Sequence, residues 1–344
     1  MRIALAQLNP TVGDLVGNCR LIAAAVAAAR EQGAELVVLS ELVVSGYPPK
    51  DLLLREGFAA ACDRAVDRLA RDLPPDIGVL LGHPTCRGLP IDRVANACSL
   101  LEGGRVQGTV QKLLLPNYDV FDERRYFRPA DSVSPLPFRG RRLGVHICED
   151  AWWGETDTFY HVDAPTLPDP VAMLVDAGAE MLINLSASPF EAHKPLRRDR
   201  LLRSHIERHH LPFVFVNQVG GNDDLVFDGH SMVWNAGGEK VVQMPGFESA
   251  LQLVDLDELP APVRERELSH AGQLLDALIL GLRDYMQKSG FTDCVLGLSG
   301  GIDSTLAAYI AARATEPGRV HGLMMPSRYS TGHSVDDAVA LAER

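Results

Sequence analysis

The chain has 344 residues, 46% hydrophobic and 23% charged, which is typical of a globular protein with enough core for two domains. Its net charge of −12 argues against nucleic acid as the main partner. No apolar run reaches the ~18 residues that cross a bilayer, so we expect no membrane span. The only basic clusters, at 197–200 and 264–266, are short and are typical of solvated faces.

Cysteine usage and the N-terminus both predict a cytoplasmic protein. The six cysteines stand far apart, none forms a CxxC pair, and a chain of this size does not need disulfides. The first residues, MRIALAQLNP, favour a strand rather than a signal peptide. We therefore expect the reducing environment of the cytoplasm.

Strand-like and helix-like runs alternate through the first three quarters of the chain, which predicts a layered α/β domain. Asp14 is a candidate N-cap for an Ala-rich helix that runs to about Glu31. A buried strand at 35–41 and an amphipathic helix at 51–73 follow. The later runs predict a strand at 77–84, a hairpin at 95–112 turning at Gly103 and Gly104, a strand at 142–150, a helix at 169–178, a strand at 181–188, a helix at 195–210, a strand at 213–220, a hairpin at 230–244 and a strand at 250–257.

A linker at 258–270, rich in Pro and charge, separates this domain from a second one. We expect a helix at 271–288, a strand at 294–296, a helix from Ser304 and a strand at 321–327. About 75 residues follow the linker, fewer than a doubly wound nucleotide-binding domain usually needs. We therefore expect this second domain to be incomplete.

The run GLSGGIDS at 297–304 joins the strand and the helix of the second domain. Its glycines let backbone N–H groups face a phosphate, and the helix N-terminus adds partial positive charge. No lysine follows the glycines, so this is not the GxxxxGK[ST] nucleotide loop. The pattern predicts an anion site.

The same run resembles the SGGxDS pyrophosphate loop of the N-type ATP pyrophosphatases, which adenylate a carbonyl oxygen and let ammonia displace AMP. The resemblance implies an ATP site in which Asp303 either holds Mg²⁺ or caps the helix. The segment MPSRYSTGHS at 325–334 resembles the stretch beside the nucleotide, with Tyr329 and Ser330 where that family usually has a Ser pair. The implied ATP-binding residues are Gly297, Leu298, Ser299, Gly300, Gly301, Ile302, Asp303 and Ser304.

Three residues of the first domain stand at predicted strand ends, where α/β folds gather their sites. Glu41 ends the second strand, Lys112 ends a hairpin strand, and Cys148 ends a strand before a turn. Considered singly, each has a plainer interpretation: a surface acid, a solvated lysine and a buried apolar cysteine. Together they supply an acid, a cation and a thiol.

The three residues and their surroundings resemble the nitrilase superfamily of carbon–nitrogen hydrolases over roughly residues 1–260. The motifs are SELVVSGYPPKD (40–51), QKLLLPNYDVFDERRYF (111–127) and HICEDAW (146–152). The stretch NYDVFDERRYF is similar to the glutaminase domain of glutamine-dependent NAD synthetases. By this resemblance Cys148 is the nucleophile, Glu41 the general base and Lys112 the stabiliser of the oxyanion.

The resemblance also implies residues that contact glutamine. Glu123 matches a second glutamate that orients the lysine or the substrate, although a surface ion pair with a nearby Arg explains it equally well. Tyr118 matches a tyrosine that contacts glutamine. In SASPFEAHK we assign Ser188 and Lys194 to the α-amino and α-carboxylate groups, with Ser186 a close competitor.

The complete prediction is an α/β protein in two parts. Residues 1–257 form a four-layer α-β-β-α glutaminase domain, and residues 271–344 begin a doubly wound nucleotide-binding domain. The resemblance implies a homo-oligomer that makes NAD from deamido-NAD, ATP and L-glutamine, with Mg²⁺ but without a prosthetic group. The alternatives are a stand-alone nitrilase-type amidase and a non-catalytic amidase relic that docks onto a separate synthetase.

Overall fold

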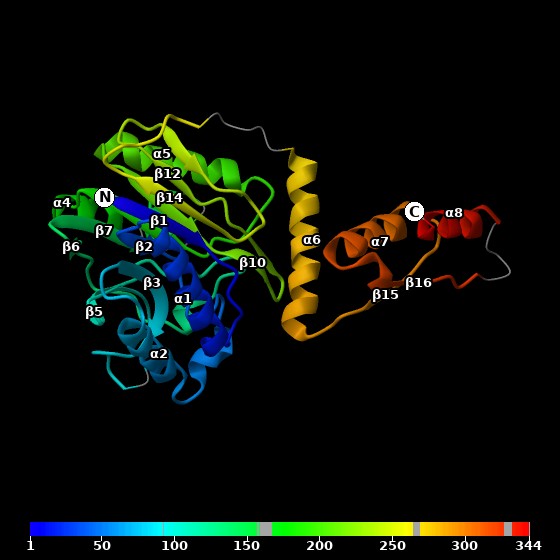
Figure 1. The fold of residues 1–344 in the computed structure, drawn as a ribbon, viewed down its shortest axis with the longest axis horizontal. Helices are drawn as coiled ribbons and strands as arrows, with labels where there is room; N and C mark the ends of the chain where they lie inside the picture. The colour runs from blue at the N-terminus through cyan, green and yellow to red at the C-terminus, as the bar shows by residue number, and fades with distance from the viewer. Residues whose placement is uncertain (92, 157, 159–166, 264–268, 327–331, 344) are drawn as a thin grey trace. The chain divides into compact units, whose positions relative to one another are not determined.

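The chain divides into two compact units in a computed structural model (Figure 1). Unit 1 comprises Met1–Val219 and Phe227–Arg266, and unit 2 comprises Gly220–Val226 and Glu267–Arg344. The expectations for Tyr329, Ser330 and the basic cluster at 264–266 lie outside the described residues. The structure describes residues 1–91, 93–156, 158, 167–263, 269–326 and 332–343.

The first sheet of unit 1 has six strands in the order β14-β1-β2-β3-β4-β5. Its centre, β1-β2-β3, is parallel, and the other neighbouring strands pair antiparallel. Gly103 and Gly104 both have positive φ in the turn between β4 and β5, as the sequence predicts. The strands are β1 (Arg2–Gln7), β2 (Leu36–Val38), β3 (Gly78–Thr85), β4 (Ala95–Glu102), β5 (Arg105–Gln111) and β14 (Ala250–Asp255).

The second sheet repeats this plan in the order β13-β12-β9-β8-β7-β6, with β7-β8-β9 parallel. The strand expected at 213–220 is two strands, β9 (Phe213–Asn217) and β10 (Val219–Asn222), and β10 pairs with β11 (Leu225–Asp228) in a separate two-stranded sheet. The remaining strands are β6 (Leu136–Phe138), β7 (Arg141–Ile147), β8 (Met181–Ser186), β12 (Met232–Trp234) and β13 (Lys240–Gln243).

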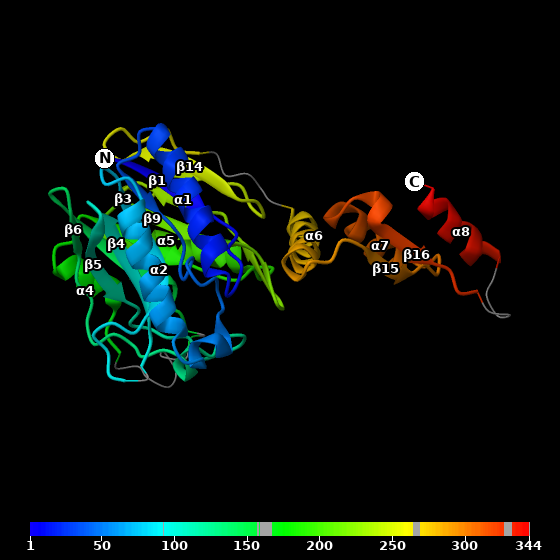
Figure 2. The same cartoon turned by 60° about the horizontal axis from the view of Figure 1, so that its bottom comes forward.

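The two sheets pack face to face, and helices cover their outer faces, which confirms the expected four layers (Figures 1 and 2). Apolar residues such as Leu5 and Val145 fill the space between the sheets. The helices α1 (Leu15–Glu31) and α2 (Phe58–Asp72) pack on the first sheet. The helices α4 (Pro170–Asp176) and α5 (Lys194–His209) pack on the second.

Local signals set the helix boundaries. Asp14 is the N-cap of α1 and accepts the N–H of Gly17 at 2.8 Å, as predicted. The single helix expected at 51–73 is wrong, because a short 3₁₀ helix at Lys50–Leu54 precedes α2. Gly57, with φ +79°, stands directly before α2, and this left-handed backbone cannot continue a helix.

Unit 2 contains a strand–helix–strand element with parallel strands. The strand β15 (Cys294–Gly297) pairs with β16 (Val320–Leu323), and α7 (Ile302–Ala314) connects them. The helices α6 (His270–Ser289) and α8 (Gly332–Ala342) flank this element in the chain. In the ranges that the structure covers, no helix is both long and apolar enough to cross a membrane.

Candidate functional site

Glu41, Lys112 and Cys148 follow strands of both sheets. Lys112 directly follows β5 and Cys148 directly follows β7, but Glu41 lies in a turn beyond β2, because that strand ends at Val38 rather than at Glu41 as expected. This turn packs on β3, where a Cβ on Gly82 would lie 2.3 Å from the backbone nitrogen of Leu42. The glycine therefore allows the close approach of the two backbones.

The ammonium group of Lys112 is fully buried between two carboxylates. Its Nζ donates to Oε1 of Glu41 at 2.7 Å and to Oε1 of Glu123 at 2.9 Å. Asn96, on β4, donates its Nδ2 to the same Glu41 oxygen at 2.7 Å. The other oxygen of Glu41 accepts the N–H of Ala187, which follows β8, at 2.9 Å. Glu41 therefore joins the two sheets.

Burial and charge set the protonation of these groups. Burial lowers the pKa of Lys112, but the carboxylates of Glu123 and Glu41 outweigh burial and raise it well above its ordinary value. Burial raises the pKa of Glu123 to about 7, although Lys112 opposes this. Glu123 Oε1 accepts the Tyr47 hydroxyl at 2.9 Å, whereas its buried Oε2 has no hydrogen-bond partner among the described residues. Lys112 is thus charged, and Glu123 can change charge near neutral pH.

Cys148 begins a short 3₁₀ helix in a left-handed conformation, with φ +42°. Only 5% of its surface is exposed. Burial and then Glu41 raise the pKa of its thiol, while Lys112 lowers it. Such a buried thiol is protonated at rest and needs a base to become a nucleophile.

Asp150, two residues after Cys148, is fully buried, and within the part of the chain that the structure describes its carboxylate accepts hydrogen bonds from backbone N–H groups alone. Its Oδ1 accepts the N–H groups of Leu113 and Leu114 at 3.1 and 2.8 Å, and its Oδ2 accepts the N–H of Ile147 at 3.0 Å. Burial raises its pKa to about 7, against the effect of these hydrogen bonds. This carboxylate also links the two sheets.

A pocket of about 60 Å³ in unit 1 opens beside Cys148. It contains four of the residues predicted from the sequence. Ser186 is absent from the lining, and its hydroxyl donates instead to Oδ1 of Asn184 at 2.6 Å. The residues that line this cysteine pocket are Tyr118, Asp119, Phe121, Cys148, Glu149, Trp152, Ser188, Glu191, Lys194 and Arg197.

The cysteine pocket carries charges of both signs. The ammonium of Lys194 lies 5.5 Å from the Phe121 ring and 5.7 Å from the Trp152 ring, a distance typical of cation–π contact. It has neither a hydrogen-bond nor an ion-pair partner among the described residues, and burial, then Arg198, lowers its pKa. Glu149, 3% exposed, accepts the Tyr118 hydroxyl at 2.6 Å.

The structure adds residues that sequence reasoning did not assign. Glu149 and Asp150 were visible beside Cys148 in HICEDAW, but nothing local indicated what they contact. No sequence motif around Asn96 indicates a functional role, because only the pairing of β4 with β3 brings this residue to Glu41. Glu123 lies buried on Lys112 and does not line the cysteine pocket, so the structure shows no surface ion pair there.

The glycine-rich loop of unit 2 is held by its own hydroxyls. The Ser304 hydroxyl donates to the carbonyl of Gly301 at 3.0 Å and lies 3.1 Å from the Ser299 hydroxyl. The helix α7 begins at Ile302, two residues earlier than expected, with Gly301 as its N-cap. Gly300 has φ +75°, and a Cβ there would lie 2.3 Å from the carbonyl oxygen of Ser334. Only glycine fits this position.

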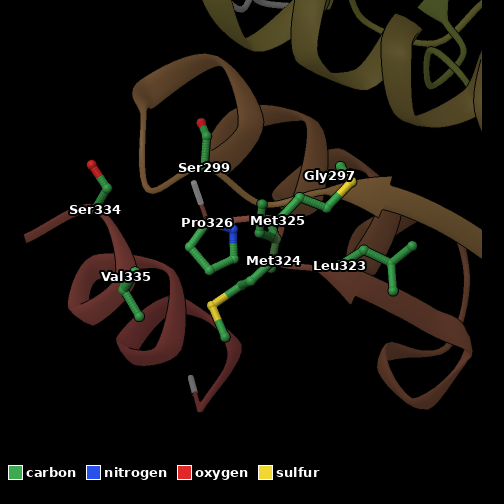
Figure 3. A pocket seen from close by; sticks show the side chains of 9 residues that line it. Gly297, Ser299, Leu323, Met324, Met325, Pro326, Ser334 and Val335 are labelled. Atoms are coloured by element: carbon green, nitrogen blue, oxygen red, sulfur yellow. The ribbon is translucent and has the colours of Figure 1, made fainter. Parts of the chain in front are cut away.

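A hollow of about 390 Å³ borders this loop (Figure 3). Ser299 lies on its loop side, and Ser334 and Val335 come from the start of α8. The remaining residues come from the strand ends and the segment after β16. They are Gly297, Leu298, Leu323, Met324, Met325 and Pro326.

Two family models match the chain. The carbon-nitrogen hydrolase model covers residues 2–265. The chain belongs to the carbon-nitrogen hydrolase family. The NAD synthase model covers residues 274–344, so this carbon-nitrogen hydrolase carries a second, different domain in the same chain.

Curated relatives span both domains. The glutamine-dependent NAD(+) synthetase of Synechocystis sp. is 40% identical over 99% of this chain, and that of Rhodobacter capsulatus is 40% identical over 100%. The chain spans 62% and 60% of the length of these relatives.

One solved structure matches nearly the whole chain, and another matches about three quarters of it. The glutamine-dependent NAD+ synthetase of Acinetobacter baumannii, in complex with ADP, has a TM-score of 0.88 and 35% identity, over 98% of this chain and 62% of its own. An amidase mutant from Nesterenkonia sp. AN1, in which acrylamide has added to the active site cysteine, has a TM-score of 0.61 and 28% identity, over 76% of this chain and 94% of its own.

We predict that Lys112→Met destabilises unit 1 by about 3 to 5 kcal/mol near pH 8, because it leaves two buried carboxylates without a cation. Without Lys112, which lowers it, the pKa of Glu123 rises further in the folded state. That state then binds more protons than the unfolded chain, so stability increases as the pH falls. Urea unfolding at pH 8 and pH 5 should show the smaller loss at pH 5.

Lys240→Met is the matched control, because Lys240 pairs with Asp199, whose side chain is 26% exposed and can be hydrated. Its loss should stay near 1 kcal/mol or less at both pH values. An equal loss for Lys112→Met at both pH values would contradict the charge argument.

Proposed function

We propose that unit 1 hydrolyses the side-chain amide of glutamine with Cys148 as the nucleophile. One observation carries this proposal: Cys148 lines a pocket that carries charged and polar side chains, while Glu41 and Lys112, hydrogen-bonded to each other, shift the pKa of its thiol in opposite directions. The Nesterenkonia amidase, with its reactive active site cysteine, supports the same chemistry.

Each residue of the triad then has a defined role. Glu41 takes the thiol proton as the Cys148 sulfur bonds to the amide carbon, and Lys112 stabilises the negative charge on the amide oxygen. The carbon–nitrogen bond breaks as Glu41 returns the proton to the leaving ammonia. Water, deprotonated by Glu41, then hydrolyses the thioester to glutamate. Glu123 holds Lys112 in place rather than contacting the substrate.

Charges of both signs suit the cysteine pocket to a free amino acid. The ammonium of Lys194, without a partner among the described residues, would pair with the α-carboxylate of glutamine. Glu149 and Glu191 supply negative charge for the α-ammonium, and Tyr118 and Ser188 supply further polar contacts. A simple nitrile or amide would leave these charges unpaired, which favours glutamine over such substrates.

We infer that unit 2 binds ATP through its glycine-rich loop, with Ser299, Ser304 and the amides of Gly300 and Gly301 around the phosphates. The hollow beside Ser299 and the complex of the Acinetobacter relative with ADP support this. Asp303 is exposed at the start of α7 and accepts no hydrogen bond from described residues, so its carboxylate suits Mg²⁺ brought in with ATP.

The whole reaction that we propose is the ATP-dependent amidation of deamido-NAD by ammonia from glutamine, giving NAD, glutamate, AMP and diphosphate. Relatives that match across both domains favour it over a stand-alone amidase, which accounts for unit 1 alone. We further propose a cytoplasmic homo-oligomer that binds neither nucleic acid nor membrane, in keeping with six free cysteines and the acidic composition.

Cys148→Ala should abolish glutamine hydrolysis, because no other group of the cysteine pocket can form the thioester. Glutamate release, measured with glutamine as the substrate, should fall to background. Cys98→Ala is the control, since Cys98 is buried in the core between the sheets and should retain turnover once folded. Normal glutamine hydrolysis by Cys148→Ala would show that Cys148 is not the nucleophile.

Glu123→Gln should remove a titration near pH 7 from the activity profile. In the wild type, kcat/KM should fall as the pH drops through about 7, because protonation of Glu123 removes one of the two carboxylate charges that hold the Lys112 ammonium in place beside Glu41. The variant is fixed in the neutral state, so its kcat/KM should be lower on the order of tenfold at pH 8.

The control for this profile is Glu102→Gln, which loses only a surface pair with Arg139 and should keep the wild-type pH dependence. A Glu123→Gln profile identical to wild type would show that Glu123 does not influence the base.

Gly300→Ala should weaken ATP binding about tenfold or more, because the added Cβ needs a left-handed backbone and meets the Ser334 carbonyl. Calorimetric titration with ATP and Mg²⁺ measures the change. Gly318→Ala is the control, since a Cβ there meets nothing within 4 Å and φ is ordinary. Equal ATP affinity in both variants would show that the loop does not bind phosphate.

A further inference from the structure

One buried carboxylate joins the segments that carry Lys112 and Cys148. Asp150 accepts the N–H groups of the two residues after Lys112 and the N–H of Ile147, the residue before Cys148. It does not line the cysteine pocket, so it has no place in the chemistry described above. Its hydrogen bonds nevertheless fix the backbone on one side of each of the two functional residues.

Two of these three hydrogen bonds, those from Leu113 and Leu114, cross from one sheet to the other. Lys112 leaves β5 in the first sheet, and Cys148 leaves β7 in the second. The apolar side chains between the sheets attract without a preferred direction. Two hydrogen bonds from adjacent backbone N–H groups to one carboxylate oxygen are directional, and they set the distance between the two segments more tightly than apolar packing does.

The conformation of Cys148 makes such a link necessary. A cysteine with φ +42° is in a sparsely populated region of backbone space. It stays there only if the surroundings fix the peptides around it. The bond from the Ile147 N–H to Asp150 holds the peptide between His146 and Ile147, and Asn184 donates to the Cys148 carbonyl at 3.4 Å.

We propose that Asp150 is a positioning residue, whose carboxylate sets the separation between the Lys112 ammonium and the Cys148 sulfur through the backbone of both segments. This deepens the proposed glutaminase function and rests on it, because the separation matters for oxyanion and thiolate stabilisation. Asp150 itself touches neither the substrate nor the reacting atoms.

The test compares Asp150→Asn with Asp63→Asn. In Asp150→Asn an NH₂ group replaces one acceptor oxygen and must face a backbone N–H, so the link opens. Asp63 is also buried and accepts the Thr85 hydroxyl at 2.7 Å and the Cys86 N–H at 3.1 Å, but it does not line the cysteine pocket. Asp63→Asn therefore controls for the loss of a buried carboxylate as such.

Asp150→Asn should lower kcat for glutamine hydrolysis on the order of 10- to 100-fold while KM changes little, because displacement of the catalytic groups affects the transition state more than binding. Asp63→Asn should lose thermal stability but keep the wild-type kcat. An unchanged kcat in Asp150→Asn, or the same loss of kcat in both variants, would overturn the proposal.

A second measurement does not depend on turnover. Iodoacetamide alkylates the Cys148 thiolate and releases iodide, and Lys112 lowers the pKa of this thiol. In Asp150→Asn the alkylation of Cys148, followed by mass spectrometry of its peptide, should be slower than in wild type and Asp63→Asn. Identical alkylation profiles would overturn the proposal.

The two measurements separate this proposal from the glutaminase function. If the wild type alkylates at Cys148 but does not hydrolyse glutamine, the proposed function fails, and the alkylation profiles alone decide the role of Asp150. If Asp150→Asn does not fold, Asp150→Glu replaces it, because the longer carboxylate keeps the charge but displaces the acceptors. The expected shifts in kcat and alkylation have the same direction.

Discussion

A fully buried ammonium group is the constraint on which the centre of unit 1 depends. Lys112 cannot be solvated, so its charge has to be neutralised by protein groups. Glu41 and Glu123 do this together, and their hydrogen bonds to Lys112 fix all three side chains. The second carboxylate makes the cluster negative overall, which keeps Lys112 protonated and leaves one glutamate able to take a proton.

Two buried carboxylates hold the two sheets together at their ends. Glu41, from the first sheet, accepts the N–H of Ala187 from the second, and Asp150, from the second, accepts N–H groups that follow Lys112. Buried carboxylates are costly unless backbone donors and cations satisfy them. Here they are satisfied only when both sheets are in place, so the fold and the geometry of the site depend on each other.

The two units place their functional groups on different physical principles. In unit 1 the side chains come from segments far apart in the sequence, and they meet through sheet packing. In unit 2 the proposed anion site is local, because a strand, a glycine-rich turn and a helix start follow one another within 294–314. In this proposal backbone N–H groups bind the phosphates, and Gly300 has the left-handed conformation that the turn needs.

Much of the fold and part of the site could be predicted from the sequence. Hydrophobic periodicity and caps such as Asp14 located the layers, and the motifs around Cys148 and Ser299 indicated the chemistry of each unit. These features involve residues close together in the chain, so they can be recognised in the sequence alone. Where local signals were incomplete, as in the helix expected across Gly57, the prediction failed because one left-handed residue is enough to end a helix.

Only the tertiary structure decided which side chains meet. Asn96 reaches Glu41 through the pairing of β4 with β3. Glu123 is buried against Lys112, although the charged residues next to it in the sequence are typical of an exposed segment. The choice of Ser188 over Ser186 at the pocket follows from contacts with residues distant in the chain. The sequence by itself determined the types of residue and their elements. Distances between elements depend on packing across the two sheets, which no local pattern encodes.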